Sequence, residues 1–123
     1  MISGKIIKGY GRGSSLLGFP TANIDTNTNM KHGVYYGWCK LDYEEKYNMM
    51  VMSIGDNPYF NNKDTSIEVH ILKGYEKDFY GSQIDIKVEG YIRDMNIKFK
   101  NMDELIERIK LDIEIAKEKL AIS

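Results

Sequence analysis

The sequence predicts a mainly β fold, a small closed or nearly closed antiparallel barrel with one helix packed on it. Two observations support this prediction. Most of the chain consists of short segments rich in β-branched, aromatic and methionine side chains, separated by Gly, Asn, Asp and Pro. After Phe99 the apolar residues instead recur every three or four positions. Closure protects the edges of many short strands, which favours a barrel over an open sheet.

Five segments are predicted as strands because they carry strand-forming residues between turn residues: Ile2–Lys8, Gly33–Leu41, Asn48–Ile54, Ser66–Leu72 and Gln83–Arg93. Apolar and polar residues alternate most clearly in the last two, as expected for strands with one buried face. Five or six strands are expected in total. The polar runs Asp25–Lys31 and Asn57–Thr65 are predicted as the longest loops.

The C-terminal segment is predicted as an amphipathic helix from Met102 to Leu120. Its apolar residues recur at helical spacing among charged ones: Leu105, Ile106, Ile109, Ile113, Ala116 and Leu120. Asn101 is a suitable N-cap, and Glu104 follows three residues later as in a capping box. The apolar stripe predicts that this helix packs against the barrel.

Length and composition predict one soluble domain spanning residues 1–123. A chain of 123 residues can bury one core but not two. The 17 basic residues nearly balance the 18 acidic ones, so the overall charge gives no reason to expect binding to nucleic acid or a membrane. The single cysteine, Cys39, cannot form an internal disulfide, and no apolar stretch is long enough to span a bilayer. A cytoplasmic location is therefore expected.

Two neighbouring segments could bind a nucleotide and a metal ion. The glycines and Arg12 in Gly9–Ser15 could bring backbone N–H groups and a positive charge to phosphate oxygens. Thr21 and Asn23 supply two hard oxygen donors that would share one side of an extended segment and could hold Mg²⁺. On pattern alone, a flexible turn explains the glycines better, and a turn beside Pro20 explains the other two residues better.

Glu68 is a candidate base for activating an alcohol in phosphoryl transfer. It lies in the middle of a predicted strand and shares the polar face with His70, to which no catalytic role is assigned. On pattern alone, a solvated outer face is the simpler interpretation. The aromatic residues between Tyr35 and Phe99 could include a slot for a planar ring system, although most must belong to the core or the barrel surface.

Taken together, ordered motifs along nearly the whole chain resemble the riboflavin kinase family, both the monofunctional eukaryotic enzyme and the C-terminal kinase module of bacterial FAD synthetases. The motifs are Gly9–Ser14, Leu17–Asn23, Gly33–Trp38, Met52–Gly55 with Asn57–Tyr59, Ser66–Ile71, Asp78–Gly81 and Gly90–Arg93. The resemblance implies a six-stranded Greek-key-like barrel. It also implies transfer of the γ-phosphate of ATP to the 5′-hydroxyl of riboflavin, which gives FMN and ADP.

The resemblance further implies roles for individual residues. Glu68 would be the catalytic base, and Thr21 and Asn23 would hold Mg²⁺, with ATP as the co-substrate. The ATP-binding residues would be Gly9, Arg12, Gly13, Ser15, Thr21, Ile71, Lys73 and Tyr80. The flavin-binding residues would be Arg93, Met95, Phe99 and Glu104.

Three features depart from the family pattern. Ser15 stands where many relatives carry Lys, and Asp56 stands where an aromatic residue is usual. The segment 93–99 is one residue longer than in common versions and lacks their Pro. None of these departures affects Thr21, Asn23 or Glu68.

The expected partners are riboflavin or FMN and ATP or ADP, with neither nucleic acid nor membrane, and the chain is expected to be a monomer. Because no adenylyltransferase-like half precedes Met1, the reaction is expected to stop at FMN. Two rival interpretations stay open. One is a flavin-binding barrel that has lost catalysis, and the other is a nucleic-acid-binding barrel, which the lack of a basic stripe disfavours.

Overall fold

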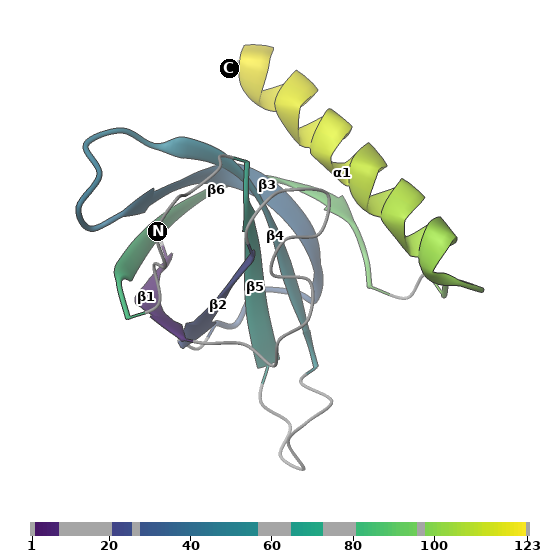
Figure 1. The fold of residues 1–123 in the computed structure, drawn as a ribbon, viewed down its shortest axis with the longest axis horizontal. Helices are drawn as coiled ribbons and strands as arrows, with labels where there is room; N and C mark the ends of the chain where they lie inside the picture. Colours follow the sequence, from purple (N-terminus) through teal and green to yellow (C-terminus); the bar gives the residue numbers. More distant parts are fainter. Residues whose placement is uncertain are drawn as a thin grey trace.

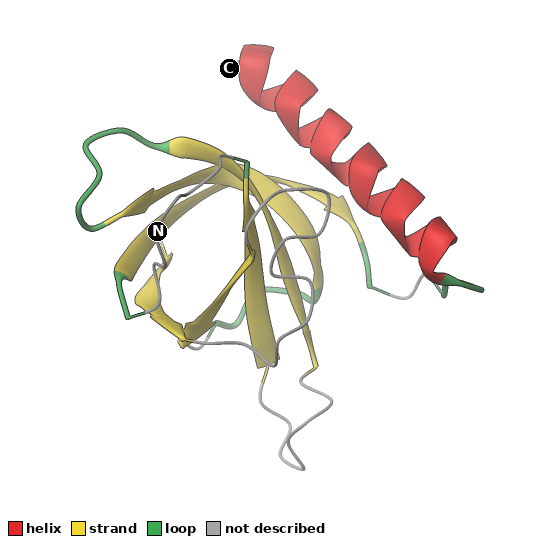
Figure 2. Ribbon diagram, in the orientation of Figure 1, coloured by secondary structure: helices red, strands yellow, loops and turns green. Residues whose placement is uncertain are grey.

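The computed structural model describes residues 2–7, 21–25, 28–56, 65–72, 81–95 and 98–122. Within these residues, the elements in chain order are β1 (Ile2–Ile7), β2 (Thr21–Asp25), β3 (Gly33–Leu41), β4 (Asn48–Asp56), β5 (Thr65–Ile71), β6 (Gln83–Arg93) and α1 (Met102–Ile122). The strands form a closed barrel in the order β1-β2-β5-β4-β3-β6 (Figure 1). Figure 2 shows that α1 packs on the outside of this barrel.

The predicted fold class, a six-stranded antiparallel Greek-key-like barrel with a C-terminal helix, is confirmed. Strands β3, β4 and β5 pair consecutively, and β6 returns to the other side of β3, which is the Greek-key order. The sixth strand is β2, which was not among the five segments predicted as strands. Its last residue, Asp25, and the first residue of β5, Thr65, were expected in loops.

The predicted element ends differ from the observed ones by one or two residues. Strand β4 continues to Asp56, and α1 continues to Ile122. Strand β5 ends one residue early, at Ile71, and Leu72 packs in the apolar cluster beneath α1. Lys8, the predicted end of the first strand, lies outside the described residues.

The barrel interior is filled by alternate residues from all six strands. Its buried members are Ile6, Ala22, Ile24, Tyr35, Cys39, Leu41, Met50, Met52, Ile54, Ile67, Val69, Ile71, Ile84 and Ile86. Burial, assisted by the nearby charge of Glu44, raises the pKa of the Cys39 thiol to about 12, so this side chain is an inert member of the core. Because side chains fill the interior, a polar ligand must bind to the outer surface.

A second apolar cluster joins α1 to the outer face of the barrel. Val34 of β3 and Val51 of β4 pack there against Ile113 and Ala116 of the helix. The partly buried residues Tyr36, Leu72, Ile92 and Ile109 extend this contact. The amphipathic helix predicted from the sequence therefore covers β3, β4 and the end of β6, and it leaves β2 without a helix packed on it.

The start of α1 is capped as the sequence predicts. The Glu104 backbone N–H donates to Asn101 Oδ1 at 2.9 Å. The Glu104 carboxylate accepts a hydrogen bond from the backbone N–H of Lys100 at 3.3 Å, so the reciprocal bond of the capping box is displaced by one residue. Among the residues described, no helix is both long enough and apolar enough to cross a membrane.

We predict that Gly37 is required where β3 approaches β6. A Cβ at this position would collide with the backbone carbonyl of Lys87, beside a shift in the β3–β6 register. Gly37→Ala should therefore lower the free energy of unfolding by roughly 1–3 kcal/mol in urea denaturation. Gly55→Ala is the matched control, since its Cβ would meet only the flexible end of Met95, at 3.4 Å. Equal destabilisation by both substitutions would contradict this explanation.

Candidate active site

The register of three strands brings two of the predicted site residues together on the outer face of the barrel. Asn23 of β2 pairs directly with Glu68 of β5, and Glu68 pairs on its other side with Ser53 of β4. Side chains of directly opposite residues project to the same face, with Cβ atoms about 4.5–5.5 Å apart. The proposed metal ligand and the proposed base are therefore adjacent.

Burial of the alternate residues explains why these polar groups face outward. Ala22 and Ile24 flank Asn23 and lie in the core, as do Ile67 and Val69 on either side of Glu68. Successive side chains of a strand point to opposite faces, so burying the apolar set fixes the polar set outside. The prediction that the strand around Glu68 has one buried and one polar face is confirmed.

Glu68 is half-buried, and this burial raises the pKa of its carboxyl group above the ordinary value. Desolvation disfavours the charged form of a carboxylate when no compensating charge is nearby. The raised pKa makes the Glu68 carboxylate a stronger proton acceptor than a solvated glutamate.

His70 lies two residues beyond Glu68 on the same face, opposite Val51 and at the edge of the helix-covered cluster. Its Nε2 atom is buried and has no hydrogen-bond partner within the described part of the chain. Burial lowers the His70 pKa, and the negative charge of Asp112 opposes that change. Desolvation therefore favours the neutral form of this imidazole.

Thr21 occupies the register position opposite His70, two residues before Asn23 in β2. Its side chain lies outside the described atoms. Across the described ranges no group of three His, Cys, Asp or Glu side chains could hold a metal ion. The donor set on β2 is instead one hydroxyl and one amide oxygen, which suits Mg²⁺ that takes its other ligands from water and nucleotide phosphates.

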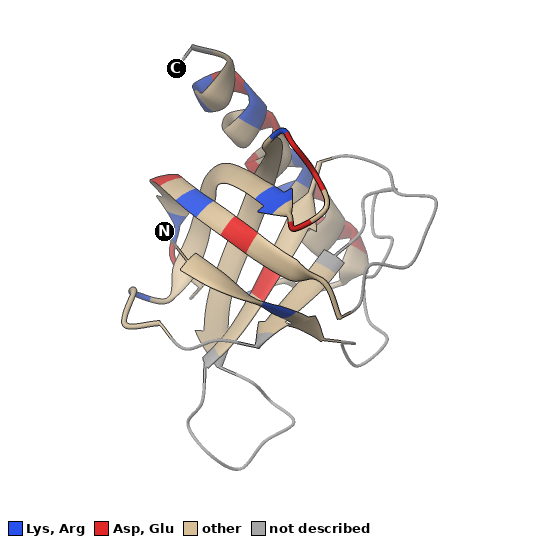
Figure 3. Ribbon diagram, turned by 90° about the vertical axis from the view of Figure 1, so that its left-hand side faces the viewer, with Lys and Arg blue, Asp and Glu red and all other residues tan. Residues whose placement is uncertain are grey.

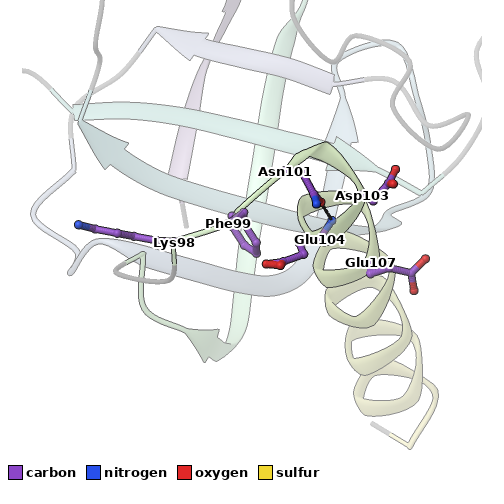
Figure 4. A pocket seen from close by; sticks show the side chains of 6 residues that line it. All are labelled: Lys98, Phe99, Asn101, Asp103, Glu104 and Glu107. Atoms are coloured by element: carbon purple, nitrogen blue, oxygen red, sulfur yellow. Dashed lines mark hydrogen bonds between the residues drawn. The ribbon is translucent and has the colours of Figure 1, made fainter.

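A shallow pocket of about 440 Å³ lies at the start of α1. It is lined by Lys98, Phe99, Asn101, Asp103, Glu104 and Glu107. Figure 4 shows the Phe99 ring beside the Glu104 carboxylate, between the entering chain and the first turn of the helix. Two predicted flavin-binding residues, Phe99 and Glu104, therefore line one pocket.

The other two predicted flavin-binding residues lie where the chain leaves β6. Arg93 is opposite Val34, and Val34 is opposite Ser53, so Arg93 belongs to the same register row as Glu68. Its guanidinium group forms an ion pair with Asp112 of α1. Met95 is exposed, and it lies near Gly55 of β4.

The predicted ATP-binding residues are described only in part. Ile71 is fully buried in the barrel interior, so its side chain faces away from the outer surface that carries Glu68. The remaining members lie outside the described residues, apart from the Thr21 backbone: Gly9, Arg12, Gly13, Ser15, Lys73 and Tyr80.

The sequence-based interpretation missed Asp112 and Ser53. Asp112 falls between Ile109 and Ile113 on the apolar side of the predicted helix, and a charged residue on such a stripe signals a buried ion pair. Ser53 carries no comparable signal, because only the pairing of β4 with β5 places it beside Glu68.

Comparison with known proteins decides the family. The sequence profile described as "Flavokinase: Riboflavin kinase" matches residues 1–120. This chain belongs to the riboflavin kinase family. Human riboflavin kinase is 38% identical over 97% of this chain and 79% of its own length. The crystal structure of riboflavin kinase from Trypanosoma brucei superposes with a TM-score of 0.73 at 29% identity, covering 97% of this chain and 78% of that one.

A longer member of the riboflavin kinase family is also similar. The bifunctional riboflavin kinase/FMN phosphatase of Arabidopsis thaliana is 44% identical over 97% of this chain, which spans 32% of that protein's length. The similarity covers the region that carries Asn23, Glu68 and the pocket at the start of α1.

We predict that Glu68 reduces the stability of the folded protein at neutral pH. Below the ordinary Glu pKa of 4.5, the folded and unfolded chains both hold the proton, and the group has no effect. As the pH rises toward the raised folded-state pKa, ionisation costs more in the folded protein, so stability falls. Glu68→Gln should thus be more stable than the wild type at about pH 7, and this gain should vanish below about pH 4.

The measurement is urea unfolding across this pH range with a metal chelator present. Glu89→Gln is the matched control, because Glu89 is exposed on β6. A Glu68→Gln protein that is less stable than the wild type at neutral pH would contradict the proposed cost of burial.

Proposed function

We propose that this chain is an ATP:riboflavin 5′-phosphotransferase that produces FMN and ADP. The observation that carries the proposal is the direct pairing of Asn23 with Glu68 on the outer face of the barrel. Phosphoryl transfer to an alcohol requires a metal-bound phosphate donor and a group that orients the attacking hydroxyl. Asn23 and Glu68, the candidates for metal binding and for orienting the hydroxyl, lie on adjacent strands.

Glu68 is the proposed catalytic base. It would orient the riboflavin 5′-hydroxyl and accept its proton as the new phosphate–oxygen bond forms. Its raised pKa supports this role, since proton transfer to a desolvated carboxylate is more favourable than transfer to a solvated one.

Thr21 and Asn23 are the proposed ligands of Mg²⁺. When bound, this ion neutralises charge on the ATP phosphates during transfer. The protein would contribute the oxygen donors from alternate positions of β2, a strand that is held on both sides by β1 and β5. Such a backbone holds the donors still, as a well-defined coordination geometry requires.

The two substrates are proposed to meet Glu68 from different directions. The ATP side comprises Gly9, Arg12, Gly13, Ser15, Thr21, Ile71, Lys73 and Tyr80. Because the Ile71 side chain is internal, we propose that it contributes through its backbone. The flavin side comprises Met95, Phe99 and Glu104, with Arg93 next to them. The half-buried Phe99 ring offers a stacking surface for an isoalloxazine ring.

We also propose that the chain acts as a cytoplasmic monomer without nucleic acid or membrane partners. Acidic and basic residues are interspersed over the described strands and α1, with no broad region of one sign (Figure 3). This distribution fits small-molecule substrates better than a polyanion.

Riboflavin, Mg²⁺ and ATP incubated with the purified chain should yield FMN, detected by chromatography. In this assay, Glu68→Gln should lower turnover by roughly 10²- to 10⁴-fold with little change in the KM for ATP, because the amide cannot accept the proton. Glu89→Gln should retain wild-type turnover. Quenching of flavin fluorescence without FMN formation would favour a binding barrel, and full activity of Glu68→Gln would reject the base.

A separate prediction concerns the metal ligands. Thr21→Val keeps a β-branched side chain on β2 but removes the hydroxyl oxygen. We expect a loss of turnover of roughly tenfold or more and a higher Mg²⁺ concentration at half-maximal activity, because phosphate charge is less well neutralised. Circular dichroism serves as the control for folding. An unchanged Mg²⁺ dependence with normal turnover would exclude Thr21 as a ligand.

A further inference from the structure

Asp112 is the one charged side chain that is fully buried among the described residues, with 2% of its surface exposed. It lies in the middle of α1, next to Ile113 and within one turn of Ile109 and Ala116, which pack on the barrel. A buried carboxylate is tolerated when it is paired and hydrogen-bonded, and removing its partner is strongly destabilising. Two arginines provide this pairing, Arg93 from the barrel and Arg108 from the helix itself.

Arg93 uses all three of its guanidinium nitrogens inside the protein. Nε donates to both carboxylate oxygens of Asp112 at 3.1 and 3.2 Å, and Nη2 donates to Oδ2 at 2.9 Å. Nη1 donates to the backbone carbonyl of Asp94 at 3.3 Å. Three of its five N–H groups are therefore engaged within the protein, and 12% of its side chain is exposed.

The ion pair connects the two ends of the segment that forms the pocket. Arg93 is the last residue of β6, and Asp112 follows 19 residues later in α1. Between them lie Phe99 and Glu104, which line the pocket at the start of the helix. Figure 1 shows the chain leaving β6 and turning back into α1 along the barrel wall. The pocket is therefore held between two points that are fixed to each other.

Strand pairing links Arg93 to Glu68, the proposed base. Arg93 pairs with Val34, Val34 with Ser53 and Ser53 with Glu68. Arg93 is therefore anchored on the same rigid sheet as Glu68, three strand spacings or about 14 Å away. A residue that ties α1 to this row also fixes the distance from the pocket to Glu68.

We propose that Arg93 is a positioning residue, which binds Asp112 and thereby holds Phe99 and Glu104 at a fixed place relative to Glu68. This inference rests on the proposed riboflavin kinase activity. It differs from direct contact with the flavin, the role that the family resemblance implied for Arg93. Its consequence is that the affinity for riboflavin depends on the Arg93–Asp112 pair as a unit.

Arg108 offers an internal comparison. Its Nε donates to the same carboxylate, at 3.2 Å to Oδ1, but Arg108 lies four residues before Asp112 in the same helix. This contact does not cross to the barrel, so it cannot set the position of α1. Loss of Arg108 should therefore leave the riboflavin KM nearly unchanged, whereas loss of Arg93 should not.

The test is a double-mutant cycle with Arg93→Met, Asp112→Asn and both together, and with Arg108→Met as the matched control. Riboflavin KM, ATP KM and kcat are measured below the unfolding temperature of every variant, and riboflavin Kd is measured by fluorescence quenching. Arg93→Met should raise riboflavin KM and Kd roughly tenfold, because a displaced pocket binds poorly. ATP KM should stay within about twofold, since neither Arg93 nor Asp112 is a proposed ATP-binding residue.

Asp112→Asn should have a similar effect, and the double variant should be no worse than either single variant, because both remove one interaction. Arg93→Lys keeps the charge but loses the bidentate geometry, so it should raise riboflavin KM and Kd by a smaller factor. It replaces Arg93→Met in the cycle if that variant does not fold.

Three results would overturn the proposal. If Arg93 touches the flavin, Asp112→Asn will leave riboflavin KM near wild type and the two effects will add. If the pair serves stability alone, the unfolding temperature will fall while riboflavin KM and Kd stay unchanged. If Arg108→Met matches Arg93→Met, attachment to the barrel is not the cause. Absence of FMN from the wild type would instead count against the proposed activity, and riboflavin Kd would still test the positioning role.

Discussion

The antiparallel register of β2 against β5 is the constraint on which the rest of the site depends. If β2 slipped by one residue against β5, Asn23 would turn toward the interior, and Ala22 and Ile24 would come to the surface. In a closed barrel such a slip also breaks pairings on the other strands, because the stagger of all six is linked. The burial that stabilises the core therefore also places the two polar groups opposite each other.

The same register divides the outer surface into two functional parts. Val34, Tyr36, Val51 and Ile92 of β3, β4 and β6 lie in the apolar cluster beneath α1, whereas Asn23 and Glu68 lie on the neighbouring β2 and β5. The helix thus ends its contact close to the proposed base, and its first turn carries the pocket. A substrate that fills this pocket and reaches Glu68 must cross the boundary between the helix-covered and uncovered strands.

Much of this arrangement was predictable from local patterns, and the rest depended on long-range pairing. Alternation identified the two faces of the strand around Glu68, and helical spacing with Asn101 as the cap identified α1. The same alternation also assigns Ile71 to the interior with Ile67 and Val69, so its side chain is not expected to reach a nucleotide on the outer surface.

Strand β2 has only five residues, and its adjacency to β5 follows from barrel closure, which no local pattern encodes. The partner of Arg93 lay 19 residues away on another element, and only tertiary packing brings Asp112 to it. Both cases involve contacts whose sequence separation is set by the fold, so residue spacing alone could not identify them.

The contrast between Asp112 and Glu68 shows how the fold assigns different roles to similar groups. Asp112 is the more deeply buried, yet two guanidinium groups offset the cost of its charge, so it is held in one geometry and serves as an anchor. Burial raises the pKa of Glu68, so this carboxylate takes up a proton more readily than a solvated one. Placing arginines beside Glu68 as well would stabilise its charge and weaken it as a base. The fold thus holds one carboxylate in an ion pair on the helix and leaves the other half-buried on the sheet, where burial raises its pKa.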